Sequence, residues 1–94
     1  MISKPAFDRG PENLNVLVNI QYFAQLRDLG GPESVELDPG ATIGVLLKKL
    51  FAQSPGLAVW NKNLLLAAGT EWVQRDYVIR PGDVISLMPP VQGG

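Results

Sequence analysis

The chain has 94 residues, a length suited to one domain, and 46% of them are apolar while 18% are charged, a balance typical of a folded protein. It contains no cysteine and no histidine, which excludes disulfides, thiolate nucleophiles and imidazole chemistry, and its nine carboxylates are not spaced as metal ligands. The formal net charge of −1 implies no basic face, so we expect no nucleic-acid partner. Because cysteine and histidine are missing and the carboxylates are scattered, we expect no metal site.

The two ends of the chain differ in composition from its middle. Residues 1–12 contain proline and glycine and lack the apolar core of a signal peptide, so we expect a flexible leader there. No apolar stretch approaches the ~20 residues that a membrane span requires. We therefore expect a cytoplasmic protein with no membrane partner, with one domain over residues 13–88 and an extended tail over residues 89–94.

Alternation of apolar and polar residues predicts two strands in the first half of the chain, over residues 14–22 and 34–37. Gly30-Gly31-Pro32 predicts a turn between them, and a second turn signal follows at residues 38–40. One face of the first strand is expected to be apolar and is formed by Leu14, Val16, Val18 and Ile20.

The main helix is predicted over residues 41–53. Thr42 is the expected N-cap, and Lys48-Lys49 lie on the polar face. A turn signal at residues 54–56 is expected to end the helix. The apolar residues follow the spacing i, i+3, i+4, i+7 and i+8 and are expected to face the core: Ile43, Leu46, Leu47, Leu50 and Phe51.

Three more strands are predicted in the second half of the chain, over residues 64–68, 71–73 and 84–88. Gly69 is expected in the hairpin turn between the first two of them. The order strand, strand, helix, strand, strand, strand predicts an α+β domain of two layers, in which a mixed sheet of about five strands packs on one main helix.

The chain ends in Pro89-Pro90-Val91-Gln92-Gly93-Gly94. Glycines lack a Cβ, so such a tail can enter a channel too narrow for side chains, and two prolines form a stiff extended spacer. A terminal carboxylate reacts with nucleophiles only after activation. We therefore expect the folded domain to serve as a carrier, with Gly94 as the reacting terminus and Gly93 giving access; the alternative is an ordinary frayed end.

Several motifs resemble one known family. YFAQLRDL at residues 22–29 is similar to its FFAQ-R-L stretch, LLAA at residues 65–68 to its LLAA strand, PGD at residues 81–83 to its DGD turn, and LMPPVQGG at residues 87–94 to its FFPPV-GG ending. Over residues 14–94 the chain resembles the small subunit of molybdopterin synthase, a sulfur carrier with a ubiquitin-like β-grasp fold. Leu87 and Met88 depart from the two aromatic residues of that family.

The resemblance implies the chemistry of the tail. Gly94 would be adenylated by a ubiquitin-activating-like adenylyltransferase, which uses ATP, and then converted to a thiocarboxylate. The tail would enter the large subunit of molybdopterin synthase, in a heterotetramer, and donate sulfur to cyclic pyranopterin monophosphate during molybdenum cofactor biosynthesis. The chain itself would bind no cofactor and carry no catalytic side chain.

The resemblance also implies an apolar patch beside the tail that binds the partner. Carried over to this sequence, the patch is Phe23, Trp72 and Met88, and the tail would add contacts through Pro89, Pro90 and Val91. The alternative for apolar residues on strands is burial in the core. Three arginines either pair with the partner or are solvated surface charges, namely Arg27, Arg75 and Arg80.

Three alternative functions remain open from the sequence. A sulfur carrier of thiamine synthesis would share the fold, although such carriers tend to be shorter and usually lack the two prolines. A ubiquitin-like protein modifier would attach Gly94 to lysines. A non-covalent β-grasp interaction module would have an inert tail.

Overall fold

The structure is a computed structural model that describes residues 15–90. The predicted leader and the last four residues, with Val91, Gly93 and Gly94, lie outside the described residues. Within the described range, no helix has the length and apolar character needed to cross a bilayer.

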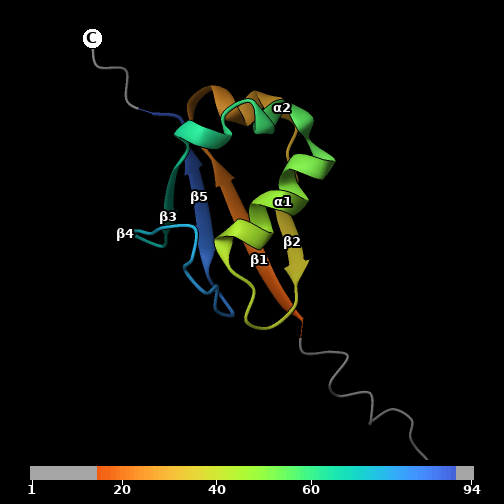
Figure 1. Cartoon of the computed structure of the whole chain (residues 1–94), viewed down its shortest axis with the longest axis vertical. Coiled ribbons are helices and arrows are strands. Elements are labelled where there is room, and N and C mark those ends of the chain that lie inside the picture. Colours follow the sequence, from red (N-terminus) through yellow and green to blue (C-terminus); the bar gives the residue numbers. More distant parts are fainter. Residues whose placement is uncertain (1–14, 91–94) are drawn as a thin grey trace, which may run out of the picture.

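Five strands form one mixed sheet in the described part of the chain (Figure 1). The order is β2-β1-β5-β3-β4, with β1 and β5 parallel at the centre and the other pairs antiparallel. The predicted mixed sheet is therefore confirmed, with strand ends that differ by one or two residues. The strands are β1 (Val16–Tyr22), β2 (Ser34–Leu37), β3 (Leu65–Ala68), β4 (Glu71–Trp72) and β5 (Val84–Met88).

Helix α1 (Ile43–Gln53) begins where the sequence predicts. The side chain of Thr42 caps it, because its hydroxyl oxygen accepts a hydrogen bond from the backbone N–H of Val45 at 3.4 Å. The next free donors are satisfied by the chain after β4: Ile43 donates to the carbonyl oxygen of Tyr77 and Gly44 to that of Arg75, both at 3.0 Å. These hydrogen bonds join the first residues of α1 to the segment that follows β4.

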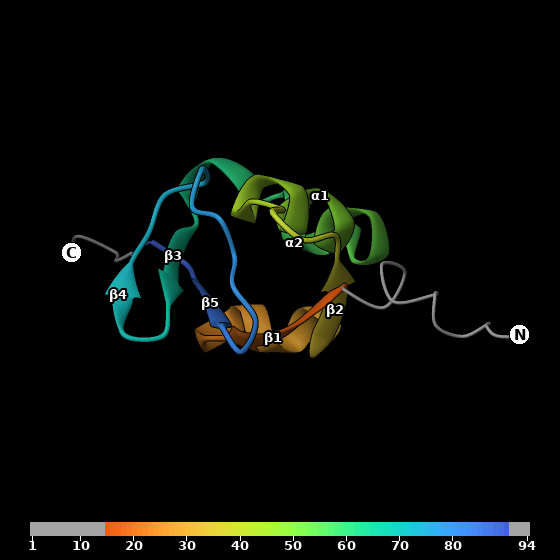
Figure 2. The ribbon, with the colours of Figure 1, turned by 90° about the horizontal axis from the view of Figure 1, so that it is seen from below.

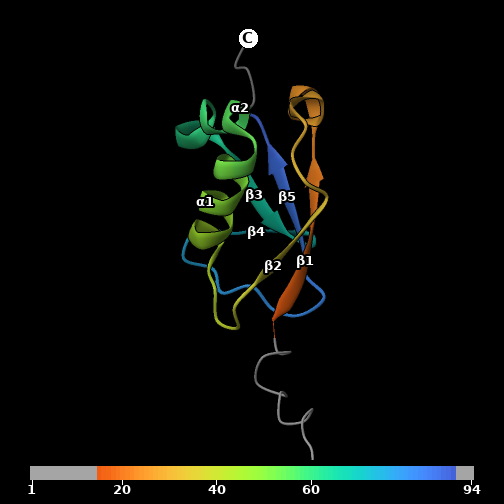
Figure 3. The ribbon, with the colours of Figure 1, turned by 90° about the vertical axis from the view of Figure 1, so that its right-hand side faces the viewer.

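The helix lies across one face of the sheet, which gives the predicted two layers (Figures 2 and 3). Four of the five residues predicted on its apolar face are buried, whereas Phe51 is half-buried at the edge of the core. The strands meet this helix with alternate side chains, so the opposite face of the sheet is not covered by α1. The strand residues that face the helix include Val18, Ile20, Leu37, Ile85 and Leu87.

Three short helical turns were not predicted. They are the 3₁₀-helix η2 (Ala24–Leu29), helix α2 (Pro55–Ala58) and the 3₁₀-helix η3 (Asn61–Asn63). The predicted end of α1 at residues 54–56 is correct, but Pro55 then starts α2, because proline is well suited to the first turn of a helix. These turns close one end of the core with Leu26 and Leu57, which are fully buried.

Candidate functional site

The face of the sheet opposite α1 carries the candidate site. Residues directly paired on neighbouring strands share a face. The pairs Gln21↔Ser86, Ala67↔Ser86 and Ala67↔Trp72 therefore form one row across β1, β5, β3 and β4. Met88 lies on the same face, two positions after Ser86 along β5.

Apolar side chains gather at one side of this face. Phe23, Trp72 and Met88, the three residues predicted for a partner site, line one shallow hollow of about 220 Å³ together with Ala67. Trp72 is 68% exposed and Phe23 is 43% exposed, whereas Met88 is half-buried. We call Phe23, Ala67, Trp72 and Met88 the apolar patch. The structure places Phe23 and Trp72 outside the core, while their role in binding stays a prediction.

The exposure of Trp72 follows from the shape of the β3–β4 hairpin. Strand β4 has only two residues and lies at the edge of the sheet, so no further strand within residues 15–90 lies beside it. Gly69 in the turn has a φ of 61°, the left-handed conformation that glycine adopts without strain, as predicted for this hairpin. Trp72 is contiguous with the other residues of the apolar patch, and a contiguous exposed apolar patch is a candidate binding surface.

The end of β1 fixes the position of Phe23. Its backbone N–H donates to the carbonyl oxygen of Leu87 at 3.1 Å, and Ala24 then takes a φ of 55°, which turns the chain sharply into η2. The hydroxyl of the preceding Tyr22 donates to the carbonyl oxygen of Pro32 at 2.6 Å, and burial raises the pKa of Tyr22 to about 12. The Tyr22 hydroxyl is thus held in its neutral, donating form.

The tail leaves the domain beside the apolar patch. Met88 is the last residue of β5, and Pro89 and Pro90 follow it and are half-buried. A partner that binds the tail at Pro90 therefore has Met88 of the patch two residues away along the chain. The reactive residues predicted at the terminus lie outside the described part of the chain.

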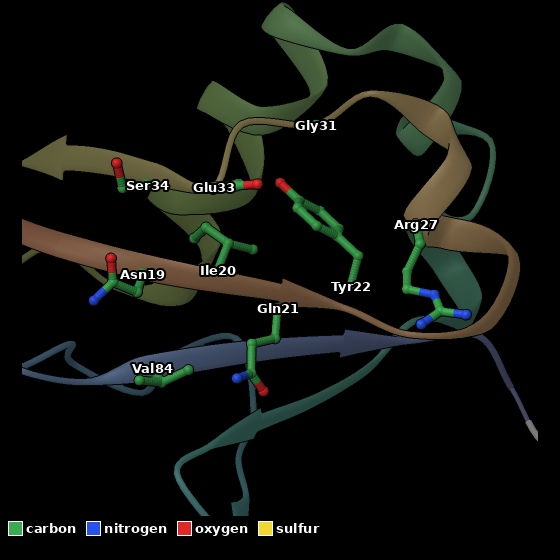
Figure 4. Close-up of a pocket in the computed structure, with 9 residues that line it drawn as sticks. All are labelled: Asn19, Ile20, Gln21, Tyr22, Arg27, Gly31, Glu33, Ser34 and Val84. Atoms are coloured by element: carbon green, nitrogen blue, oxygen red, sulfur yellow. The ribbon is translucent and has the colours of Figure 1, made fainter.

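A second, more polar groove lies on the other side of Gln21 (Figure 4). The Ser86 hydroxyl donates to the side-chain oxygen of Gln21 at 3.4 Å, so a residue that lines the hollow of the apolar patch contacts one that lines the groove. The groove has a volume of about 640 Å³ and holds the oppositely charged side chains of Arg27 and Glu33. Arg27 was predicted as a possible partner contact, but the groove was not predicted, because it depends on the path of residues 30–33 beside Tyr22.

The side chain of Arg75 contacts a neighbouring turn, whereas Arg80 contributes a hydrogen bond through its backbone only. The guanidinium of Arg75 donates to the side-chain oxygen of Asn61 at 2.8 Å and to the backbone carbonyl of the same residue. The backbone N–H of Arg80 donates to the Asp83 carboxylate at 2.9 Å, which also accepts from the Tyr77 hydroxyl at 2.7 Å. The hydrogen bond from the Tyr77 hydroxyl to Asp83 raises the pKa of Tyr77. Across residues 15–90, no group of three acidic side chains gathers that could hold a metal ion.

Comparison with known proteins identifies the family. The sequence model described as the ThiS family matches residues 20–94, which is most of the chain and includes the Gly-Gly ending. The chain belongs to the ThiS family. The fold of this ThiS-family chain is the ubiquitin-like β-grasp expected from the resemblance.

Individual relatives narrow the comparison within the ThiS family. The chain is 32% identical over 81 residues to the molybdopterin synthase sulfur carrier subunit of Escherichia coli (strain K12), covering 83% of this chain and 100% of the relative. It is 32% identical over 90 residues to small archaeal modifier protein 3 of Haloferax volcanii, covering 82% and 98% of the two chains. The resemblance to molybdopterin synthase sulfur carriers is thereby confirmed.

One similar solved structure contains two proteins. It is the protein–protein complex of subunits 1 and 2 of molybdopterin-converting factor from Helicobacter pylori 26695. The matching chain has a TM-score of 0.57 and 25% identity, and the match covers 84% of this chain and 100% of that chain. A chain of the same fold as this ThiS-family protein thus occurs in a two-subunit complex.

Proposed function

We propose that this chain is the sulfur-donating small subunit of a molybdopterin synthase, and that Gly94 carries the sulfur as a thiocarboxylate. The observation that carries the proposal is the 32% identity to the sulfur carrier subunit of Escherichia coli over that protein's whole length. The ThiS-family match, which runs to Gly94, supports the same assignment.

The proposed chemistry takes place on the tail and is catalysed by other proteins. The Gly94 carboxylate attacks the α-phosphorus of ATP in an activating adenylyltransferase, which gives an acyl-adenylate and releases pyrophosphate. Hydrosulfide from the sulfur source then attacks the acyl carbon, displaces AMP and leaves the thiocarboxylate. The glycines suit this role because they present no side chain to the enzyme channel.

The proposed partner is the large subunit of molybdopterin synthase, in a heterotetramer of two large and two small subunits. The tail delivers the thiocarboxylate to cyclic pyranopterin monophosphate there, and the large subunit supplies the catalytic side chains. Two observations support this partner: the Helicobacter pylori relative occurs in a complex of subunits 1 and 2, and the apolar patch lies beside Pro89 and Pro90. Burying Phe23 and Trp72 against a partner would stabilise such a complex.

The intact mass of the protein tests the proposal. The chain is incubated with ATP, a cognate adenylyltransferase and a sulfur source, with a second sulfur carrier as the positive control. We expect a mass gain equal to the replacement of one oxygen by sulfur, located on the C-terminal peptide. An unchanged mass beside a converted control would contradict the carrier function.

A second candidate function is protein modification, favoured by the relative named small archaeal modifier protein 3. Activation of Gly94 would begin in the same way, but a lysine amine would displace AMP and form an isopeptide bond. Expression of the chain with an N-terminal tag separates the two functions. A ladder of tagged conjugates that disappears when Gly94 is deleted would favour the modifier, whereas free thiocarboxylated chain would favour the sulfur carrier.

A further inference from the structure

Met88 carries the only sulfur atom within residues 15–90. The chain has two methionines and no cysteine, and Met88 is the methionine that lies within residues 15–90. It is half-buried and lines the hollow of the apolar patch beside Phe23 and Trp72. It also directly precedes the Pro89-Pro90 spacer, so it is the residue of the patch from which the tail continues.

The packing of Met88 separates its role from that of its strand neighbours. Leu87 and Ile85 are fully buried in the core under α1. The Met88 side chain belongs neither to this core nor to the residues packed against it. Its backbone is held in the sheet by pairing with Leu65. A change in the polarity of this thioether therefore acts on the outer face of the sheet and leaves the core intact.

The chemistry available to such a thioether is reversible oxidation. A sulfur lone pair attacks one oxygen of hydrogen peroxide, and the S–O bond forms as the O–O bond breaks. The departing hydroxide takes up the proton of the sulfur-bound hydroxyl, which gives the sulfoxide and water. Sulfur is oxidised by two electrons and the peroxide is reduced. The product, methionine sulfoxide, is polar, and methionine sulfoxide reductases convert it back to methionine.

We propose that Met88 is a redox modification site, and that its sulfoxidation by peroxide weakens docking of the apolar patch onto the large synthase subunit. The inference rests on the proposed function, which names that partner. The physical reason is that a sulfoxide oxygen between Phe23 and Trp72 must lose its water when the patch is covered, and burial of a polar group without a hydrogen-bond partner is costly. Peroxide would thus slow sulfur delivery without unfolding the carrier.

The first test is whether peroxide reaches the sulfur. The purified full-length chain is treated with hydrogen peroxide at a concentration that oxidises free methionine, and its peptides are mapped by mass spectrometry. We expect one added oxygen on the peptide that contains Met88, and none on the same peptide of the Met88→Leu variant. An unoxidised Met88 peptide would overturn the proposal.

The second test measures affinity for the large subunit before and after peroxide. Oxidised wild-type chain should bind about tenfold more weakly, the scale of one important interface residue, and a methionine sulfoxide reductase should restore binding. Met88→Leu should give the same affinity with and without peroxide, whatever its starting value, because leucine has no sulfur. The melting temperature of the oxidised chain should match that of the reduced chain.

The outcomes separate this inference from the function on which it rests. If the reduced wild-type chain does not bind the large subunit, the proposed function fails and the inference with it. If the reduced chain binds and the Met88 sulfoxide binds equally well, the inference alone fails. If the oxidised chain binds more weakly and also melts at a clearly lower temperature than the reduced chain, the sulfoxide acts on folding. That outcome would also overturn the inference.

Discussion

The backbone N–H of Phe23 donates to the carbonyl oxygen of Leu87 at 3.1 Å, and this hydrogen bond joins the end of β1 to the end of β5. Because β1 and β5 are parallel, both strands finish at the same end of the sheet. An exposed aromatic residue is thereby held beside the point where the tail begins. The parallel pairing of β1 and β5 thus determines where Phe23 lies relative to the start of the tail.

Trp72→Ala should weaken binding more than it weakens folding. The side chain is 68% exposed, so we expect a loss of about tenfold or more in affinity for the large synthase subunit, and a change of less than about 1 kcal/mol in the free energy of unfolding. Calorimetric titration and thermal unfolding measure the two effects. Val59→Ala is the matched control, because Val59 is 82% exposed but does not line the patch. Normal affinity with a large loss of stability would show that the indole packs on the domain.

Tyr22→Phe should destabilise the domain by about 1 kcal/mol at neutral pH, because it leaves the carbonyl oxygen of Pro32 without the half-buried hydroxyl that donates to it. The folded-state pKa of Tyr22 is about 12, above the ordinary value of 10.0, so the folded state holds this proton more tightly than the unfolded state. Stability linked to Tyr22 is therefore fully present below pH 10 and is lost as the pH rises toward 12.

Urea unfolding of wild type and Tyr22→Phe between about pH 8 and pH 12 measures this dependence. The range includes the ordinary pKa of tyrosine, 10.0, and the folded-state pKa of Tyr22, about 12. The difference in stability between the two proteins should shrink over the upper half of that range. Tyr77→Phe serves as a comparison, because the pKa of Tyr77 is raised mainly by its hydrogen bond to Asp83. A difference between wild type and Tyr22→Phe that is independent of pH would contradict the role assigned to burial of Tyr22.

Local sequence patterns predicted the elements whose residues act within one helix or strand. The N-cap at Thr42 is an example, because the cap contact spans three residues. The turn into η2 was missed, because it depends on a positive φ at Ala24, which alanine rarely adopts, and η2 buries only Leu26. The exposure of Trp72 depends on the edge position of β4, and the groove beside Tyr22 depends on a contact with Pro32; both arise from tertiary structure.

Gly31→Ala should destabilise the domain through a steric clash. A Cβ at this position would lie 2.5 Å from the Tyr22 hydroxyl oxygen, so the ring or the 30–33 segment must move. We expect a loss of about 1–3 kcal/mol in the free energy of unfolding, the usual cost of overpacking. Gly56→Ala is the control, because a Cβ there would meet Leu29 at an ordinary 3.7 Å. Equal stability of the two variants would show that Tyr22 has room to move.

Deletion of Gly94 should abolish sulfur transfer without changing stability. The buried core lies between Val16 and Leu87, so the shortened chain should keep the circular dichroism spectrum and unfolding midpoint of the wild type. The terminal carboxylate, however, would be one residue short of the position that the activating enzyme and the synthase require. Production of molybdopterin from cyclic pyranopterin monophosphate by the reconstituted synthase measures the loss, which should reach the background rate without carrier.

Gln92→Ala is the matched control for this deletion, because it alters the tail while keeping its length and both glycines. It should support sulfur transfer at a rate close to that of the wild type, since the proposed function places only the glycines and the carboxylate of the tail in the enzyme channel. If the chain without Gly94 transferred sulfur as well as Gln92→Ala, the reacting group would have to lie elsewhere. The carrier assignment would then give way to a non-covalent binding module.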